Sequence, residues 1–151
     1  MERLLAFISI LIALLCSNTA KAQTVCYPDS DGAQTECKIN IEAEKGYISG
    51  ICVLIHEGDS INGAIVNEFG LTALNFYYST KEDKVKLENV ASMLDKWYIR
   101  PVLSNDIREL LHALKEGKTE YKDEKYHISY LLSPMDTEDD GNNDDDEQPT
   151  E

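Results

Sequence analysis

Alternating apolar and polar residues predict that the middle of the chain forms β-strands. Five segments have the two-residue period of a strand: 38–42, 47–56, 61–67, 71–79 and 85–88. Tyr47 to His56 is apolar on both faces, which predicts a central strand covered on both sides. The links between these segments are short, and one of them, Glu57 to Ser60, contains Gly58 at a position that suits positive φ. We therefore expect a five-stranded antiparallel meander.

The apolar period then changes to that of a helix. Val90, Met93, Leu94, Trp97 and Tyr98 recur at spacings of three and four, which predicts a helix from Asn89 to about Arg100 that Pro101 interrupts.

A second apolar stripe follows at Ile107, Leu110, Leu111 and Leu114. We expect Ser104 or Asn105 to cap the start of this second helix and Gly117 to close its end.

After the second helix, Glu120-Tyr121 and Tyr126 to Leu132 predict a closing hairpin over a turn at 122–125. The order of these elements predicts an α+β fold, in which two amphipathic helices pack on the concave face of an antiparallel meander sheet. If the sheet curls into a half-barrel, a slot opens between sheet and helices, and such slots take apolar ligands.

The first residues have the anatomy of an export signal. Arg3 precedes the apolar run Leu4 to Leu15, which is too short for a bilayer span, and small residues flank Lys21 at Ala20 and Ala22. We expect residues 1–22 to be a signal peptide cleaved after Ala22, with no membrane span remaining. The alternative is a lipoprotein acylated at Cys16. Either reading predicts a periplasmic, outer-membrane-associated or secreted protein.

Most of the negative charge lies at the C-terminal end. The formal net charge is −14, and residues 134–151 contain nine acidic residues but neither Lys nor Arg. We interpret 134–151 as a disordered acidic tail and 23–133 as a single domain. A negative chain repels phosphate backbones, so nucleic-acid binding is not expected. The tail could gather divalent cations loosely, but we interpret it as a solvated segment.

Three cysteines follow the predicted cleavage site. Cys26 and Cys37 bracket a polar loop, and a disulfide between them would stabilise the fold by roughly 2–3 kcal/mol in an oxidising compartment. Cys52 lies in an apolar run and is expected to be a buried thiol. There is no Cys-x-x-Cys, so neither a redox centre nor a zinc site is expected.

Several short motifs resemble those of one protein family. They are Ile48-Ser-Gly50, Asn67-Glu-Phe-Gly70, Asn75-Phe-Tyr77, Leu94-Asp-Lys-Trp-Tyr98 and Val102-Leu-x-x-Asp-Ile107. In this order they resemble small exported proteins of Gram-negative bacteria, which are similar in strand order to the LolA/LolB type of lipoprotein carrier. The resemblance covers about Tyr47 to Leu114. It implies an open, half-barrel-like sheet with helices over its concave face, and no catalytic residue.

We therefore expect a non-enzymatic envelope protein that binds a lipid or the acyl chain of a lipoprotein. The slot would be lined by eight side chains: Val53, Ile65, Leu74, Phe76, Met93, Leu94, Trp97 and Leu111. Glu68 is a candidate contact for a ligand head group. The alternative for Asn67 to Gly70 is a structural turn, in which Asn67 bonds to backbone, Phe69 anchors the core and Gly70 supplies an unusual φ.

The chain offers few other sites. His56, His112 and His127 have no spacing that links them to a nucleophile or a metal, and Asp29-Ser-Asp-Gly32 lacks the later ligands of a calcium loop. No cofactor or metal is expected. The main alternative function is a protein–protein interaction module of an envelope complex.

Overall fold

The computed structural model describes residues 26–135. The predicted signal peptide, the alternative of acylation at Cys16 and the acidic tail beyond Met135 lie outside the described residues. The described chain contains seven strands and one helix. The strands are β1 (Gln34–Ala43), β2 (Gly46–Glu57), β3 (Ser60–Asn67), β4 (Thr72–Ser79), β5 (Lys84–Glu88), β6 (Glu120–Asp123) and β7 (Ile128–Pro134), and the helix is α2 (Arg100–Lys115).

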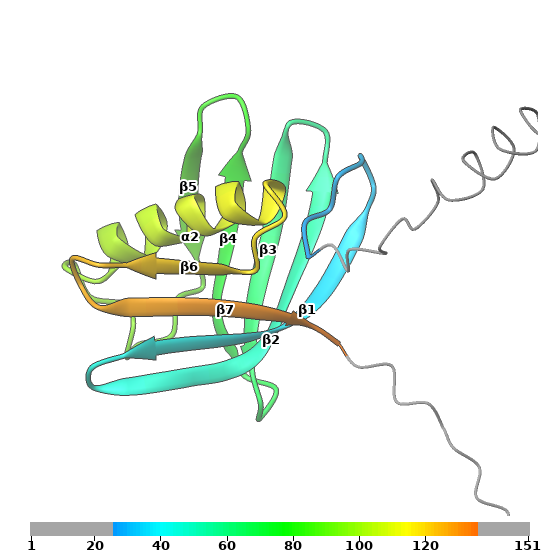
Figure 1. The fold of residues 1–151 in the computed structure, drawn as a ribbon. Helices are drawn as coiled ribbons and strands as arrows, with labels where there is room; N and C mark the ends of the chain where they lie inside the picture. The colour runs from blue at the N-terminus through cyan, green and yellow to red at the C-terminus, as the bar shows by residue number, and fades with distance from the viewer. Residues whose placement is uncertain (1–25, 136–151) are drawn as a thin grey trace, which may run out of the picture.

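All seven strands form one antiparallel sheet in the order β5-β4-β3-β2-β1-β7-β6. The first five strands are the predicted meander, and each pairs with the next along the chain. The predicted closing hairpin is also present, but its turn lies at 124–127 rather than 122–125. Because β7 pairs with β1, the last strand returns beside the first, and the sheet curls into a half-barrel (Figure 1).

The middle of the curled sheet has a local irregularity. The pairing of β3 with β4 shifts register between Ile65 and Val66, which marks a β-bulge. Beside it, Gly50 of β2 lies so close to the Val66 carbonyl that a Cβ could not fit there. A bulge bends a strand, and glycine permits the close approach of two backbones.

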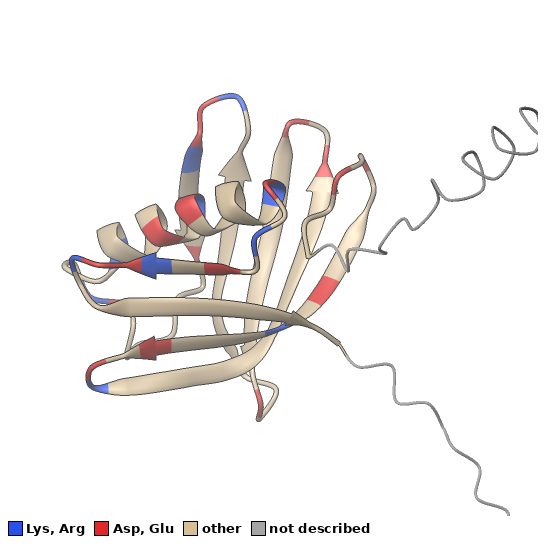
Figure 2. Ribbon diagram, viewed as in Figure 1, with Lys and Arg blue, Asp and Glu red and all other residues tan. Residues whose placement is uncertain are grey.

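Apolar side chains of alternate residues form the core on the concave face. β1 contributes Ile39 and Ile41, and β2 contributes Cys52 and Leu54, all of which are buried. The convex face of β2 carries Ile51, Val53 and Ile55, which are only half-buried, and no described element covers them. The prediction that β2 is covered on both sides is therefore wrong. Charged residues are absent from β3 and β4, and they lie mainly in turns, in α2, in β1 and in the outer strands β5 and β6 (Figure 2).

One helix lies across the concave face, where two were predicted (Figure 1). α2 begins at Arg100 with Pro101 in its first turn, so the predicted start at Ser104 or Asn105 is wrong. Its predicted end is confirmed: Gly117 has φ of +83°, and the Lys118 and Gly117 amides donate to the carbonyls of Ala113 and Leu114. This double bond is the Schellman motif, in which glycine adopts the left-handed conformation.

The helix protects one edge of the sheet. It contacts both edge strands, β5 and β6. The Ser104 hydroxyl donates to the Val85 carbonyl at 2.7 Å, and the Arg100 guanidinium donates to the Leu87 carbonyl at 3.2 Å. β5 is an edge strand, and these two carbonyls have no neighbouring strand to bond with. Because α2 bonds to them, they are not left open to a strand of another chain.

The helix predicted from Asn89 to Arg100 is absent. Asn89 has φ of +45°, outside helical geometry, and separate turns follow at 92–94 and 97–99. Leu94 packs against the core, whereas Met93 and Trp97 are exposed. The three- and four-residue spacing therefore does not place these side chains on one buried face.

The predicted disulfide joins Cys26 to Cys37, with their Cα atoms 6.1 Å apart. Cys52 is buried with a free thiol, as predicted, and burial raises its pKa to about 12. The disulfide attaches the loop before β1 to the sheet, and His56 of β2 makes a second attachment: its Nδ1 lies 2.9 Å from the Pro28 carbonyl.

Candidate functional site

An apolar pocket of about 380 Å³ opens at one end of the half-barrel. It lies where the β1–β2 hairpin tip, the turn segment 91–99, the start of α2 and the start of β7 meet. Its apolar wall is formed by Ile41, Ile48, Ile65, Leu74, Leu94, Ile99, Leu103 and Ile128, with Tyr130. We call it the end pocket. Its volume falls within the 300–1,000 Å³ typical of ligand pockets.

The period of the strands explains why this wall is apolar. Ile41, Ile48, Ile65 and Leu74 come from four neighbouring strands, and all four side chains face the concave side of the sheet. Further along the same face, α2 packs against Leu54 and Phe76, and a space of only about 10 Å³ remains there. The concave face is thus filled under the helix and hollow beyond its N-terminal end.

A shallower groove of about 480 Å³ adjoins the end pocket. The two hollows share Ala43, Lys45, Ile99, Leu103 and Ile128 in their linings. The groove adds the partly exposed side chains Tyr98, Val102 and Tyr126 and the carboxylate of Glu44. Together the hollows form a continuous apolar surface from the interior of the half-barrel to solvent.

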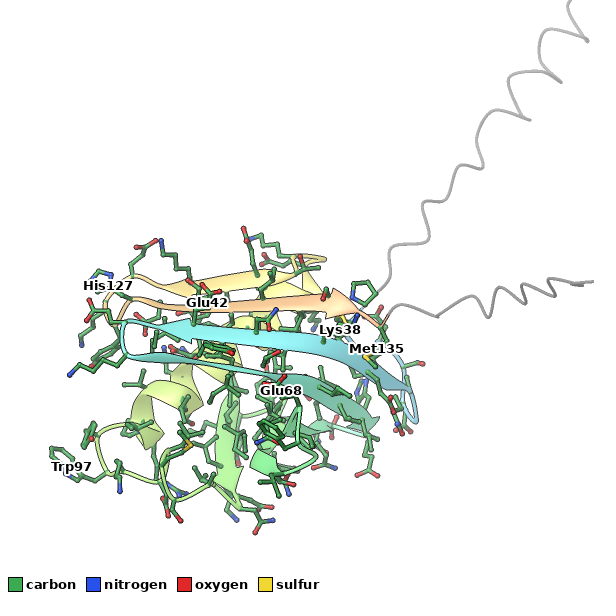
Figure 3. The ribbon with its side chains drawn as sticks, turned by 90° about the horizontal axis from the view of Figure 1, so that it is seen from below. Lys38, Glu42, Glu68, Trp97, His127 and Met135 are labelled. Atoms are coloured by element: carbon green, nitrogen blue, oxygen red, sulfur yellow. A yellow bond between two sulfur atoms is a disulfide. The ribbon has the colours of Figure 1, made fainter. Side chains whose placement is uncertain are left out.

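Exposed apolar side chains surround the mouth of the end pocket. Tyr47 and Met93 line it and are 73% and 72% exposed. Trp97 is 86% exposed, makes an edge-to-face contact with Tyr98 and lines neither hollow; in Figure 3 it points away from the body of the protein. Large apolar side chains grouped on a surface often mark an interaction site.

The structure separates the eight side chains predicted to line a slot. Ile65, Leu74, Met93 and Leu94 line the end pocket. Phe76 and Leu111 lie instead in the filled core under α2.

The other two predicted lining residues are elsewhere. Val53 faces the convex side of the sheet, because its neighbours Cys52 and Leu54 face the core. Trp97 is outside both hollows. The sequence analysis missed Ile48, Ile99, Leu103 and Ile128. Ile48 could have been predicted, because it is apolar and lies an even number of residues from the buried Cys52 and Leu54 of β2, so it faces the same side of the sheet.

Glu68 is exposed in the β3–β4 turn and lines neither hollow (Figure 3). The Asn67 side-chain oxygen accepts hydrogen bonds from the Phe69 and Leu71 amides, and Gly70 has φ of +77°. These are the roles expected of Asn67 and Gly70 in a structural turn. Phe69, however, is 82% exposed, so the prediction that it anchors the core is wrong.

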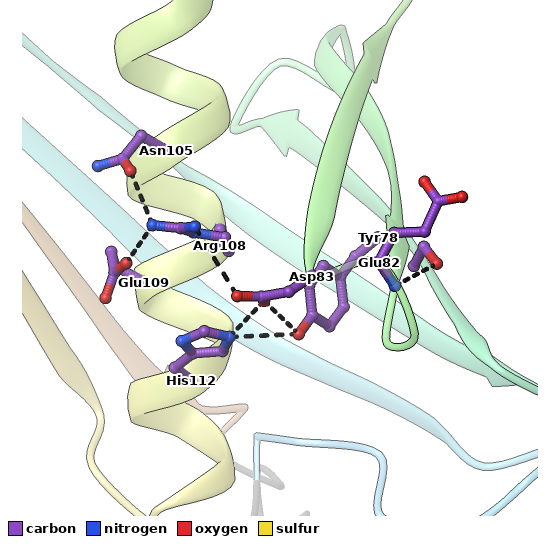
Figure 4. Close-up of polar contacts among 8 residues, drawn as sticks. Tyr78, Glu82, Asp83, Asn105, Arg108, Glu109 and His112 are labelled. Carbon is purple, nitrogen blue, oxygen red and sulfur yellow. Dashed lines mark hydrogen bonds and ion pairs between the residues drawn. The ribbon is translucent and has the colours of Figure 1, made fainter.

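A polar cluster ties the β4–β5 turn to α2 (Figure 4). Asp83 Oδ1 lies 2.7 Å from His112 Nε2 and accepts a 3.0 Å hydrogen bond from the Tyr78 hydroxyl, while Arg108 lies 3.8 Å from Asp83 Oδ2. Desolvation favours the neutral acid, but the bonds from Tyr78 and His112 outweigh it and hold the pKa of Asp83 below its usual value. Burial and the bond to Asp83 raise the pKa of Tyr78 to about 12.

The side chains of this cluster are therefore committed to one another. We interpret the cluster as a structural contact between α2 and the β4–β5 turn.

A second polar contact is fully buried. Asp106 of α2 has no exposed surface, and its Oδ2 accepts a 2.8 Å hydrogen bond from the Tyr130 hydroxyl of β7. Burial raises the pKa of Asp106 to about 7, and the neighbouring Asp123 carboxylate adds to the rise, although the bond from Tyr130 acts against it. The Asp106 carboxyl therefore titrates near neutral pH.

Residues 26–135 contain no group of three His, Cys, Asp or Glu side chains that could hold a metal ion. Within this part of the chain, α2 is neither long nor apolar enough to cross a membrane.

Comparison with known proteins adds no relative. No protein-family model matches the chain, and no curated protein or solved structure matches it either.

Proposed function

We propose that the protein binds an apolar chain, such as that of a lipid or of a lipoprotein acyl group, in the end pocket. The observation that carries this proposal is the hollow itself: about 380 Å³ lined by aliphatic side chains, next to a core that is otherwise filled. An apolar hollow open to water is costly unless a ligand or a partner covers it, because its surface remains hydrated.

Binding would follow from partition of the chain out of water. Each buried methylene stabilises the complex by about 0.8 kcal/mol, so about ten buried methylenes correspond to the roughly 8 kcal/mol of a micromolar complex. No covalent step is needed, and we propose no catalytic residue. If residues 1–22 are the export signal that the sequence predicts, this activity belongs to the cell envelope.

The test compares two isoleucines of β2. Ile48 lines the end pocket, whereas Ile51 lies on the convex face, and both are half-buried. We expect Ile48→Asn to weaken binding of decanol about 5- to 30-fold, which corresponds to about 1–2 kcal/mol of lost apolar contact. Ile51→Asn should leave the affinity within about twofold. Isothermal titration calorimetry on the mature chain measures both.

The proposal would be contradicted if both variants lost decanol affinity equally, or if the unaltered protein did not bind decanol. Native mass spectrometry of protein purified from its own envelope without detergent gives an independent readout. A reproducible bound mass that dissociates as a lipid is expected.

A second candidate function is docking to a protein partner of the envelope. The exposure of Trp97 favours it, because this side chain lines neither hollow and yet remains in water. Tryptophan is enriched among the residues that dominate binding energy at interfaces. Under this alternative, Trp97→Ser abolishes partner crosslinking in the envelope while decanol affinity stays unchanged; unchanged crosslinking contradicts it.

A further inference from the structure

We infer that the ligand of the end pocket is a single-chain amphiphile with an anionic head group, and that Lys45 holds this head group at the mouth. The inference rests on the proposed function, since it requires an apolar chain in the pocket. It narrows that function to acids such as fatty acids or single-chain phosphate esters, as distinct from the uncharged amide-linked chain of a lipoprotein.

The first observation is the position of Lys45. It lies in the turn between β1 and β2 and is exposed. Among the described residues that line the end pocket, Lys45 is the one charged side chain, and all the others are apolar, glycine or tyrosine. Lys45 also lines the adjoining groove, so it stands where the apolar wall meets solvent.

The second observation is that Lys45 has no ionic partner among residues 26–135. Four other lysines of the described domain lie beside carboxylates: Lys81 beside Asp59, Lys86 beside Glu88, Lys118 beside Glu116 and Lys122 beside Glu124. Lys84, Lys96, Lys115 and Lys125 share with Lys45 the absence of such an ion pair within residues 26–135. No carboxylate within residues 26–135 is within ion-pairing distance of Lys45, although its chain neighbour Glu44 lines the groove.

Another lysine contacts a residue of the groove without lining the groove itself. The Lys125 ammonium stands 4.9 Å from the centre of the Tyr126 ring, and Tyr126 lines the groove. Among the described residues, the linings of the two hollows hold one lysine, Lys45, and one glutamate, Glu44, in a chain whose net charge is −14. The end pocket itself has Lys45 as its one charged lining residue, which suits an anion and disfavours an ammonium head group.

The geometry then sets the shape of the ligand. A chain that enters past Tyr47 and Met93 reaches the wall of Ile65 and Leu74, and its polar end stays at the hairpin tip beside Lys45. A volume of about 380 Å³ lies near the lower end of the range for ligand pockets, which suits one chain better than two.

The test uses three ten-carbon probes that share a chain and differ in charge: decanoate, decanol and decylammonium. Calorimetry on the mature protein, below the concentrations at which the probes form micelles, should give decanoate about five- to tenfold higher affinity than decanol, and decylammonium the lowest. The preference for decanoate should shrink as salt is added. Decyl phosphate in place of decanoate distinguishes a phosphate head group from a carboxylate.

Two variants complete the design. Lys45→Glu should remove the preference for decanoate and raise the affinity for decylammonium, with decanol binding unchanged. Lys84→Glu makes the same charge change on an exposed lysine at the start of β5, beside the β4–β5 turn. This variant should bind the three probes in the same order of affinity as the unaltered protein.

The two proposals fail in different ways. If all three probes bind equally and Lys45→Glu alters none of them, the head-group inference is overturned and the apolar pocket stands. If no probe binds at all, both proposals are overturned.

Discussion

Gly63 and Phe76 are paired across β3 and β4, with both residues on the concave face. The Phe76 ring lies over Gly63 in the space that a Cβ would occupy. A methyl group there would overlap the edge of the ring, and the ring is buried and cannot move without disturbing its neighbours. The absence of a side chain at position 63 is thus part of the core packing.

We expect Gly63→Ala to lower the free energy of unfolding by about 1–3 kcal/mol, the usual cost of overpacking a core. Urea denaturation of the mature protein measures it. Gly46→Ala is the control, because a Cβ at Gly46 meets no atom within 4 Å, and it should change stability by less than about 0.5 kcal/mol. Equal effects of the two substitutions would show that Phe76 adjusts freely.

At the scale of elements, α2 and the β6–β7 hairpin meet at the buried carboxyl of Asp106. Its hydrogen bond from Tyr130 joins the helix to β7, and the Asp123 carboxylate of β6 lies nearby. The Asp123 side chain also accepts hydrogen bonds from the amides of Lys125 and Tyr126 and so shapes the hairpin turn. A single titration in this contact therefore affects how the helix and the hairpin hold together.

The pKa of Asp106 is about 7 in the folded chain and 3.8 as the ordinary value of aspartate. Between these values the folded chain keeps a proton that the unfolded chain has released. The contribution of this group to the free energy of unfolding is therefore fully present below about pH 4, and it is lost as the pH rises to about 7. A shift of this size corresponds to a loss of about 4 kcal/mol.

We expect Asp106→Asn to remove this decline, because an amide cannot ionise and its oxygen can still accept the bond from the Tyr130 hydroxyl. Urea denaturation of both proteins at a series of pH values from 4 to 8 measures the difference in slope. Asp29→Asn removes an exposed carboxylate and should retain the decline. A decline that persists unchanged in Asp106→Asn would show that the proton resides elsewhere.

At the scale of the whole molecule, the strands could be predicted from the sequence, whereas the polar contacts between distant residues could not. Strands such as β3 and β4 are apolar on alternate residues, a local pattern that a short segment carries by itself. The contacts of His112 with Asp83 and of Asp106 with Tyr130 join residues 29 and 24 positions apart. No local period encodes such pairs, so these contacts were outside the reach of sequence reasoning.

The error at 89–100 and the incomplete site have one cause. Met93 and Trp97 are apolar and have the spacing of a buried helical stripe, but both side chains are exposed. No core therefore lies beneath them to stabilise a helix. Pattern reasoning assumes that an apolar side chain is buried in its own domain. Side chains at a pocket mouth break this assumption, so Met93 and Leu94 were placed correctly beside a cavity but in the wrong kind of element.

The pairing of Cys37 with Pro134 has a consequence for how the domain can be held. The disulfide brings Cys26 to the same end of the sheet, so both ends of the described domain lie close together there. The hairpin tips that frame the end pocket lie at the other end, where Figure 3 shows His127 and Trp97 opposite Met135. A domain tethered to a surface through either terminus would therefore turn the mouth of the end pocket away from that surface.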